Sequence, residues 1–292
     1  MPPSLRAQQL NADGNAALDA GRLDDAIAAF SQAAALAPSW STPWYNLGLV
    51  YKRQKQWRQS LEHNRRAAAL DPSNEPAWWN MGIAATATGD WDLARAAWRG
   101  FGIDVPDGDG PIDLPCGVGP IRLEPDGDGE VVWCQRLDPA RAQILSIPLP
   151  ESGHCWQDVI LNDGEPVGYR QYRGQERPVF NALALLERSP FGTYVARVAM
   201  PKDRASIARL SEIASERGGA AEDWSASVRM ICKACSEGRP HERHDTELPA
   251  DGAHLIGIAA RSREHASEIL QAFEAGREDV RVEWLDDALV RG

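Results

Sequence analysis

The sequence predicts a multidomain protein of the α + (α+β) type, in which an array of paired helices precedes a small β-rich domain and an α+β domain. Three observations lead to this prediction. A 34-residue period runs through the first third of the chain, short alternating apolar stretches separated by turn residues follow it, and the last hundred residues alternate strand and helix patterns. We therefore expect domains at residues 1–108, 109–190 and 191–292.

Length and composition set the first limits on function. The 292 residues are 43% hydrophobic and 25% charged, which is typical of a folded chain of two or three domains. The net charge of −11 argues against a nucleic-acid partner. No window approaches the ~20 apolar residues of a membrane span, and the N-terminal segment has no apolar signal-peptide core. We therefore expect a cytoplasmic protein with no membrane or nucleic-acid partner, whose five cysteines form no disulfide framework.

Glycine, proline and tryptophan positions carry the 34-residue period. The positions that keep this spacing are Gly14, Gly48 and Gly82; Pro38, Pro72 and Pro106; and Trp44 and Trp78. Between them, helix-period apolar stretches alternate with a glycine turn and a proline stop. One helix pair is too small to bury its own apolar face, so about three must stack. The pattern predicts three helix pairs, at residues 7–40, 41–74 and 75–108.

This pattern resembles the tetratricopeptide repeat, whose 34-residue unit has a large residue, Leu-Gly, an aromatic residue, two small residues and a closing proline. The second unit matches best, through Trp44, Leu47, Gly48, Tyr51, Ala67 and Pro72. The first unit is weaker, because Leu10 and Ala17 stand where large and aromatic residues are usual. The resemblance covers a little over a third of the chain. It implies a protein-interaction module whose first helices line a concave groove for an extended peptide or a partner helix.

The repeat register places the partner-binding residues that this resemblance implies on the first helix of each unit. They are Asn11, Asn15 and Leu18 in the first unit, Tyr45, Asn46, Leu49, Lys52 and Arg53 in the second, and Trp79, Asn80 and Ile83 in the third. Neighbouring side chains on a helix point about 100° apart, so we expect Trp78 in the core and Trp79 in the groove. Asn46 has a second interpretation, because asparagine is also common at this position in the plain repeat.

Two features bear on the chemistry of the partner. One subgroup of the family clamps the C-terminal carboxylates of chaperones, but Asn11, Pro76 and Asn80 stand here where that clamp has basic residues. The second unit also carries a basic run, made of Lys52, Arg53, Lys55, Arg58, Arg65 and Arg66. This run indicates either a groove edge for an acidic peptide, which the acidic C-terminal half could itself supply, or a solvated helix face.

The end of the third unit needs a cover. Trp98 and Phe101 lie in its last helix, and a repeat array normally ends in a polar capping helix. The segment that follows, DVPDGDGPIDLPCGVGP, is instead rich in proline and glycine. We expect the later part of the chain to pack there as the cap.

The middle of the chain predicts a small antiparallel β barrel or sandwich. Alternating strand patterns occupy residues 119–125, 130–137, 142–149, 156–163, 167–172 and 177–181. The Asp-Gly pairs at 126–127, 128–129 and 163–164 predict hairpin turns. His154 and Cys155 are neighbours, but no surrounding pattern supports a cysteine nucleophile, and buried cysteines that pack as small hydrophobes are the favoured alternative.

The last hundred residues follow the order strand, helix, strand, strand, helix, strand. The strands are expected at residues 193–200, 224–235, 254–260 and 280–290, and the helices at 202–219 and 262–278. This order implies two split βαβ units, which form a ferredoxin-like sandwich of one four-stranded sheet and two helices. Many unrelated functions share such a platform, so the fold decides little.

A possible metal site lies between the second and third of these strands. Cys232 and Cys235 form a CxxC pair, and His241 and His244 follow as HxxH. Two thiolates and two imidazoles satisfy the tetrahedral preference of zinc, so we expect a structural zinc at these four residues. An unmetallated loop, a redox CxxC and an open catalytic metal are the alternatives.

Together these patterns favour a protein-interaction adaptor that binds a peptide or partner segment in the groove. The alternative is a metal sensor or metal-dependent enzyme that uses Cys232, Cys235, His241 and His244 and recruits its target through the repeats. The sequence contains no nucleotide-binding glycine loop, acyl-transfer triad signature or HExxH motif, which makes an enzyme the less favoured hypothesis.

Overall fold

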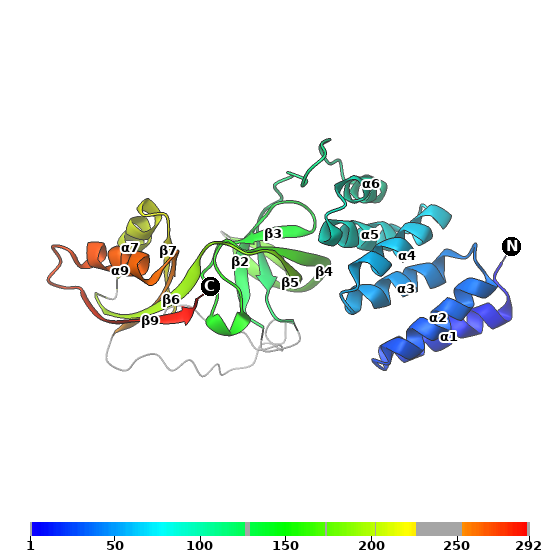
Figure 1. Ribbon diagram of the computed structural model, residues 1–292, viewed down its shortest axis with the longest axis horizontal. Helices are drawn as coiled ribbons and strands as arrows, with labels where there is room; N and C mark the ends of the chain where they lie inside the picture. Colours follow the sequence, from blue (N-terminus) through cyan, green and yellow to red (C-terminus); the bar gives the residue numbers. More distant parts are fainter. Residues whose placement is uncertain (1, 126–128, 173, 202, 226–252, 291–292) are drawn as a thin grey trace. The chain divides into compact units, whose positions relative to one another are not determined.

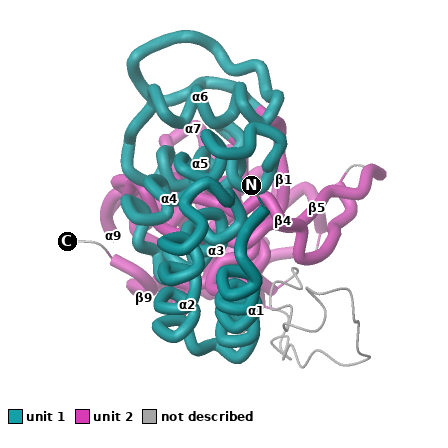
Figure 2. Tube along the Cα trace, turned by 90° about the vertical axis from the view of Figure 1, so that its right-hand side faces the viewer, with its two compact units in different colours: residues 1–115, 137–141 teal, residues 116–136, 142–292 magenta. Residues whose placement is uncertain are grey.

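The computed structural model describes residues 2–125, 129–172, 174–201, 203–225 and 253–290. Two compact units make up the chain, as Figure 2 shows. Unit 1 contains residues 1–115 and 137–141, and unit 2 contains residues 116–136 and 142–292. The described helices of unit 1 and the two β-sheets of unit 2 can be followed in Figure 1.

Unit 1 is an array of consecutive helix pairs, as the 34-residue period predicts. The helices are α1 (Leu5–Asp19), α2 (Leu23–Leu36), α3 (Ser41–Arg53), α4 (Trp57–Leu70), α5 (Glu75–Thr88) and α6 (Trp91–Phe101). Side-chain oxygens of Ser4, Asn74 and Asp90 accept backbone N–H groups at the starts of α1, α5 and α6. No helix in the described part of the chain is long and apolar enough to cross a membrane.

In each helix pair, a glycine of the first helix packs against a side chain of the second helix. The pairs are Gly14 with Phe30, Gly48 with Asn64, and Gly82 with Trp98. A Cβ atom on Gly82 would lie 2.6 Å from the Trp98 ring, which is itself fully buried. The recurrence of glycine every 34 residues therefore follows from close packing rather than from turn geometry.

The third helix pair is followed by an irregular segment at residues 103–114, which we call the strap. The strap runs back along α6, because Arg99 Nη2 donates to Val105 O at 3.0 Å and Arg95 Nε donates to Pro106 O at 3.0 Å. The polar capping helix that usually ends such an array is thus replaced at this end by a segment held through its own carbonyl groups.

A turn at residues 137–141 joins the strap in unit 1. Arg141 Nη2 donates to Ile112 O at 2.6 Å, and the Arg141 guanidinium lies 4.9 Å from the centroid of the Trp91 ring. Asp138 is fully buried and pairs with Arg141 Nε at 2.6 Å. This turn lies well beyond residue 108, so part of the cover of the array comes from a later hairpin of the chain.

The first sheet of unit 2 contains five strands. They are β1 (Gly117–Arg122), β2 (Val131–Arg136), β3 (Arg141–Ile144), β4 (Val159–Tyr172) and β5 (Gln175–Glu187). The strands follow one another in sequence order, and β1 pairs with both β2 and β5. The pairing of β1 with β5 is parallel. An odd number of strands in this up-and-down order puts the first and last in the same direction, so the sheet is not wholly antiparallel as expected.

The hairpin turn expected at Asp163-Gly164 is absent, and this prediction is wrong. Strand β4 runs through these residues to Tyr172, whose partner in β5 is Gln175. The register shifts between Asn162 and Gly168, which marks bulges in the strand. The Asp163 carboxylate accepts the Gly164 N–H at 2.8 Å and satisfies this backbone group locally. The other two Asp-Gly pairs involve residues 126–128, which lie outside the described residues.

The second sheet of unit 2 has the strand order β7-β8-β6-β9. Its elements are β6 (Gly192–Ala199), α7 (Arg204–Glu216), β7 (Ala220–Asp223), β8 (His254–Ala260), α9 (Arg263–Glu274) and β9 (Arg281–Leu289). All neighbouring strands are antiparallel. Side chains of β6 and β8 form one apolar core with those of α7 and α9, including Ile256, Leu210 and Phe273.

A short strand, β7, precedes the strand expected at residues 224–235, most of which lies outside the described residues. Strand β7 begins at Ala220, directly after α7 ends, and it stops at Asp223. A Cβ on Gly219 would lie 2.6 Å from Ala259 O, so the chain already touches β8 before β7 begins. Periodicity alone missed this short strand because its four residues include two charged ones. Residues 226–252 lie outside the described part of the chain.

Candidate peptide-binding groove

The first helices of the three pairs, α1, α3 and α5, are joined by polar side chains. Asn46 Nδ2 donates to Asn11 Oδ1 at 2.9 Å and to Asn15 Oδ1 at 3.3 Å, which links α3 to α1. Lys52 Nζ donates to Asn80 Oδ1 at 3.0 Å, which links α3 to α5. Five of the residues assigned to the groove from the register therefore form one polar ladder across the three helices.

The residues of the ladder differ in what they offer a partner. Asn11, Asn46 and Asn80 are only 8%, 7% and 5% exposed, so most of their surface is buried in contacts between helices. Asn15 is exposed and Lys52 is half-buried. The ladder thus has a buried structural part and an accessible part on α1 and α3.

The other residues assigned to the groove also include both accessible and buried side chains. Tyr45 and Leu49 are half-buried and Arg53 is exposed, all on α3. Leu18 is 6% exposed, and Ile83 has no exposed surface. The accessible side chains thus gather on α3, while Ile83 presents nothing to a partner in this structure.

The two neighbouring tryptophans of α5 both pack on α6. Trp79 meets Trp98 and Phe101 edge-to-face, with ring centroids 5.1 and 4.8 Å apart. Trp78 lies against Gly100, and its indole N–H donates to Pro72 O at 3.0 Å. Both tryptophans are half-buried. The expected division, with Trp78 in the core and Trp79 in the groove, is therefore less sharp than the 100° rule suggests, because the Trp79 ring leans toward α6.

The basic run of the second unit is divided between two helices. Lys52 and Arg53 lie at the end of α3, whereas Arg58, Arg65 and Arg66 are exposed on α4. Arg66 lies over the Trp44 ring, 5.8 Å from its centroid. Only the cations of α3 belong to the helices that carry the polar ladder.

The middle helix pair also contains a stacked histidine that sequence reasoning missed. The His63 ring lies between Trp44 and Tyr51, at centroid distances of 5.8 and 5.3 Å. Burial lowers the pKa of His63 from its ordinary value of 6.5, and the nearby Glu62 carboxylate opposes this shift. The signal in the sequence was a histidine on a helix whose partner helix carries three aromatic residues.

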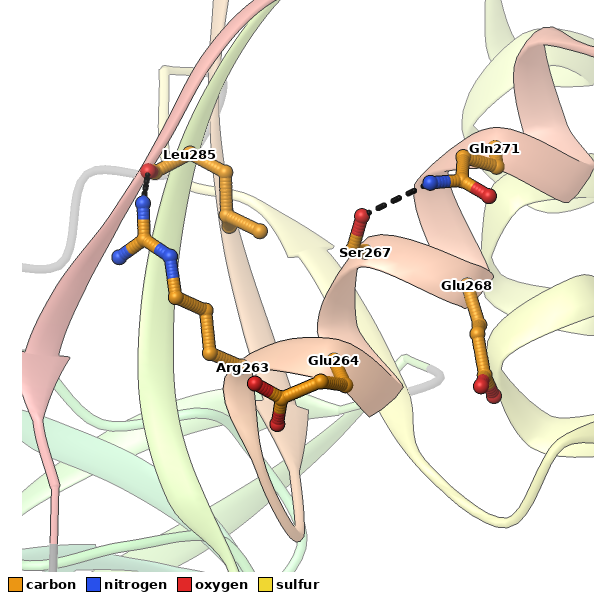
Figure 3. Close-up of a pocket in the computed structure, with 6 residues that line it drawn as sticks. All are labelled: Arg263, Glu264, Ser267, Glu268, Gln271 and Leu285. Atoms are coloured by element: carbon orange, nitrogen blue, oxygen red, sulfur yellow. Dashed lines mark hydrogen bonds between the residues drawn. The ribbon is translucent and has the colours of Figure 1, made fainter.

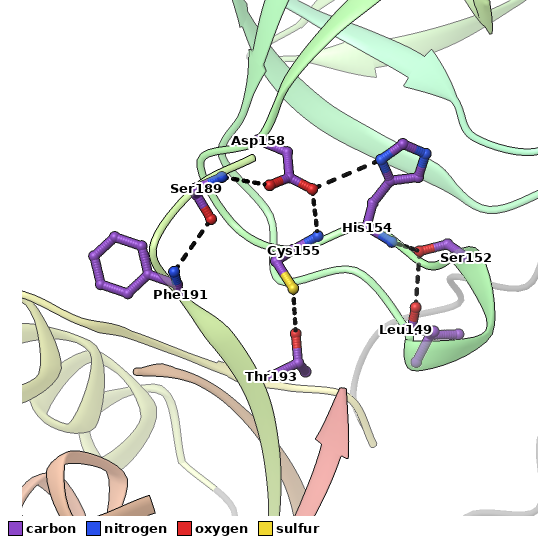
Figure 4. Close-up of polar contacts among 8 residues, drawn as sticks. All are labelled: Leu149, Ser152, His154, Cys155, Asp158, Ser189, Phe191 and Thr193. Carbon is purple, nitrogen blue, oxygen red and sulfur yellow. Dashed lines mark hydrogen bonds and ion pairs between the residues drawn. The ribbon is translucent and has the colours of Figure 1, made fainter. Parts of the chain in front are cut away.

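Cys155 and His154 do not form an accessible catalytic pair (Figure 4). Cys155 is fully buried, and its Sγ accepts a hydrogen bond from Thr193 Oγ1 at 3.8 Å. Asp158, also fully buried, accepts the N–H groups of Cys155 and Ser189 at 2.9 and 2.8 Å, and His154 Nδ1 lies 3.8 Å from its carboxylate. These contacts fasten the start of β4 to the segment before β6, which is a structural role. Burial likewise raises the pKa of the Cys134 thiol inside the barrel.

The expected zinc ligands, Cys232, Cys235, His241 and His244, lie outside the described residues. Within the residues that are described, no group of three or more His, Cys, Asp or Glu side chains could hold a metal ion. A buried pair flanks the undescribed segment: His254 Nδ1 and Asp223 Oδ2 are 2.7 Å apart. The prediction of a zinc site therefore still rests on the spacing of the four residues in the sequence.

A shallow pocket beside α9 and β9 offers little chemistry (Figure 3). Its lining consists of Arg263, Glu264, Ser267, Glu268, Gln271 and Leu285. Arg263 is already engaged, because it donates to Leu285 O and to Asp287 Oδ1. The lining has neither a cysteine nor a histidine, so the groove of unit 1 remains the better candidate site.

Comparisons with known proteins agree with the helical array. Residues 14–55 match the family model described as TPR repeat, so this part of the array consists of tetratricopeptide repeats. No curated protein matches the chain.

Solved structures with a similar array include three tetratricopeptide domains. The Sgt2 TPR domain from Aspergillus fumigatus is 26% identical, with a TM-score of 0.32, over 34% of this chain and 66% of that chain. The second TPR of Spaghetti (RPAP3), bound to the HSP90 peptide SRMEEVD, is 20% identical, with a TM-score of 0.32, over 33% of this chain and 90% of that chain. The TPR2B domain of yeast Sti1, in a complex with pHsp70, is 15% identical, with a TM-score of 0.32, over 34% of this chain and 78% of that chain.

Proposed function

We propose that the protein is a protein-interaction adaptor that binds an extended acidic peptide or partner segment along α1, α3 and α5. The observation that carries the proposal is the polar ladder across these helices, which presents Asn15 and Lys52 beside the exposed Arg53. Amide groups can bind the backbone of an extended peptide, and the two cations favour carboxylate side chains on it.

The apolar part of the proposed surface is small and lies on the same helix. Tyr45 and Leu49 are half-buried on α3 and stand about one helical turn apart, so they lie on one face of the helix. Tyrosine is a frequent anchor in protein interfaces because it buries much apolar area and keeps a polar end. An acidic peptide with one apolar residue would match this arrangement.

The test uses the Tyr45→Ala/Lys52→Ala variant of the full chain. Peptides selected from a random display library against the parent should be enriched in Asp and Glu, and the variant should bind them at least about tenfold more weakly, since interface anchors of this kind contribute more than ~1 kcal/mol each. Trp79 is left intact, because its replacement would also remove the ring packed on Trp98.

The matched control removes one cation of the same basic run from the other helix of the middle pair. Arg65→Ala changes the net charge by the same amount as Lys52→Ala, but Arg65 is exposed on α4. It should leave peptide binding unchanged apart from a small effect of ionic strength. A library without acidic enrichment would refute the acidic partner, and equal binding by the parent and the double variant would refute the groove.

The finer assignments of unit 2 also remain proposals. The order β7-β8-β6-β9, with antiparallel neighbours and the sequence order βαββαβ, supports the ferredoxin-like assignment. The closure of β1 on β5 supports the barrel.

A structural zinc at Cys232, Cys235, His241 and His244 is a separate proposal that rests on their spacing. Elemental analysis of the purified, chelator-washed chain should find about one zinc per chain. The Cys232→Ser/Cys235→Ser variant should have lost it. A parent without zinc would refute this site and leave the groove proposal unaffected.

A further inference from the structure

The second helix of the last pair, α6, differs from α2 and α4 at one position of the repeat. The 34-residue register aligns Ile27, Leu61 and Arg95. Ile27 packs on an apolar cluster that includes Leu47 and Val50 of α3, the first helix of the next pair. This position therefore adjoins an apolar cluster that the first pair shares with the following helix pair, and in the last unit it is occupied by arginine instead of an apolar residue.

Arg95 binds the strap instead of a helix. It is only 6% exposed, and its Nε donates to Pro106 O at 3.0 Å while Nη1 donates to Trp91 O at 3.3 Å. Gly108 follows in the strap with a φ of +143°, and a Cβ there would lie 3.3 Å from Arg95 Nη2. The guanidinium thus sits between α6 and the strap and satisfies backbone carbonyls of both.

Further contacts hold the two ends of the strap. Near its start, Arg99 Nη2 donates to Val105 O at 3.0 Å and to Asp107 Oδ1 at 2.6 Å. Near its end, Arg141 Nη2 donates to Ile112 O at 2.6 Å. The Val105 and Ile112 side chains are 3% and 0% exposed. The strap is therefore held near both ends, with the Val105 and Ile112 side chains buried.

We propose that the strap caps the helical array at the end of its third helix pair. It covers the face of α6 on which a further helix pair, or the same end of a second copy of this chain, would otherwise pack, and Arg95 holds it in place. Repeat arrays need such a terminal cover because an uncovered repeat exposes the apolar surface that its neighbour would bury. This role is independent of the groove and of its partner.

The test replaces Arg95 with leucine, because the first two units have an apolar residue at this position. In the full-length Arg95→Leu variant we expect cleavage within residues 103–114 to be about tenfold faster under limited proteolysis, because a buried charged hydrogen bond is lost. Analytical ultracentrifugation should show a mass that rises with concentration toward twice that of the parent. Arg65→Leu, which puts leucine on the exposed face of α4, is the matched control and should behave as the parent in both measurements.

Two outcomes would overturn the proposal. If the strap of Arg95→Leu is cut faster but the mass equals that of the parent at every concentration, the strap does not block association. If the rate of cleavage is unchanged, Arg95 does not hold the strap. Because Arg95 is buried and its replacement could disturb α6, Arg99→Gln provides a second variant: Arg99 is exposed, and we expect smaller changes in the same direction, with parent-like results in both measurements again overturning the proposal.

Discussion

The middle helix pair of the array differs from the outer two in the side chain that closes it. Phe30 and Trp98 fill this place in the outer pairs and have no exposed surface. In the middle pair the place belongs to Asn64, which is also fully buried and donates to Ser60 O at 2.8 Å. One backbone arrangement thus accepts a large ring or a small amide, but the amide buries less apolar surface and requires hydrogen-bond partners.

The same middle pair carries most of the accessible side chains of the proposed groove. Tyr45, Leu49, Lys52 and Arg53 all lie on α3, and His63 of α4 stacks on two aromatic rings of that helix. The helix pair with the polar interior is therefore also the pair that carries most of the proposed binding surface. We infer that the middle pair is the least stable of the three. Each of the following substitutions alters either the middle pair or an outer pair.

The largest effect is expected from Trp98→Ala. Loss of a buried tryptophan should reduce the opening free energy of α5 and α6 by about 3–5 kcal/mol, because it removes apolar contacts and leaves a cavity. Asn64→Ala should cost α3 and α4 less than this. Hydrogen exchange of the helix amides in the full chain measures both. Equal losses in the two variants would contradict the comparison.

Gly82→Ala should cost about 1–3 kcal/mol, because the new methyl group would overlap the rigid Trp98 ring. Gly48→Ala meets the end of the short Asn64 side chain, which can rotate away, so its cost should be smaller. Thermal unfolding of the two variants, followed by circular dichroism at a helix wavelength, ranks them. A larger loss for Gly48→Ala would show that the Asn64 amide is fixed more firmly than its size suggests.

Asn64→Phe should stabilise the middle pair by about 1 kcal/mol. The substitution restores the kind of ring found at Phe30, and it removes an amide whose Oδ1 has no hydrogen-bond partner among the described residues. Ser60 Oγ keeps its bond to Gly48 O, at 2.8 Å. Denaturant unfolding of the full chain measures the change. Asn64→Asp, which buries a charge, is the opposing control and should destabilise the pair.

The smallest effect concerns pH. The pKa of His63 is lower in the folded chain than its ordinary value of 6.5, so the folded state binds fewer protons than the unfolded state. The stability of the middle pair should therefore be greatest above pH 6.5 and fall as the pH drops below it, until the folded pKa is passed. Thermal unfolding from about pH 7.5 to about pH 4.5 tests this. His63→Phe keeps the stack and should flatten this part of the profile; an identical profile would assign the pH dependence to other groups.

Much of unit 1 could be predicted because its contacts are local. Helix pairs that recur every 34 residues leave a repeating pattern of glycine, proline and apolar residues, and their stacking follows from the same register. The helices that carry the polar ladder could be predicted, since the register placed Asn46, Asn80 and Lys52 on the correct helices. The hydrogen bonds of the ladder could not be predicted, because a register gives the helix and its face but not the side-chain rotamer. The leaning of Trp79 toward α6 was missed for the same reason.

Unit 2 was harder because its strands pair over long distances. Alternation identified the strands around Ile121, Val132 and Ile160, but Asp163-Gly164 indicated a turn where β4 continues with bulges. An Asp-Gly pair is a local turn signal, and it does not reveal whether a partner strand pairs with the residues before and after it. The short strand β7 was missed because Ala220–Asp223 has little apolar alternation of its own and depends on β8 for its backbone hydrogen bonds.

The sequence by itself determined the repeat, the number of helix pairs, the helices that carry the polar ladder and the order of the described strands and helices in the last hundred residues. The tertiary structure alone decided how the array ends. Arg95 and Arg141 bind carbonyl groups of the strap, and Arg141 is 46 residues further along the chain. Backbone carbonyls are present at every residue and so leave no mark in a sequence. Which of them an arginine reaches is settled only when the chain has folded around it.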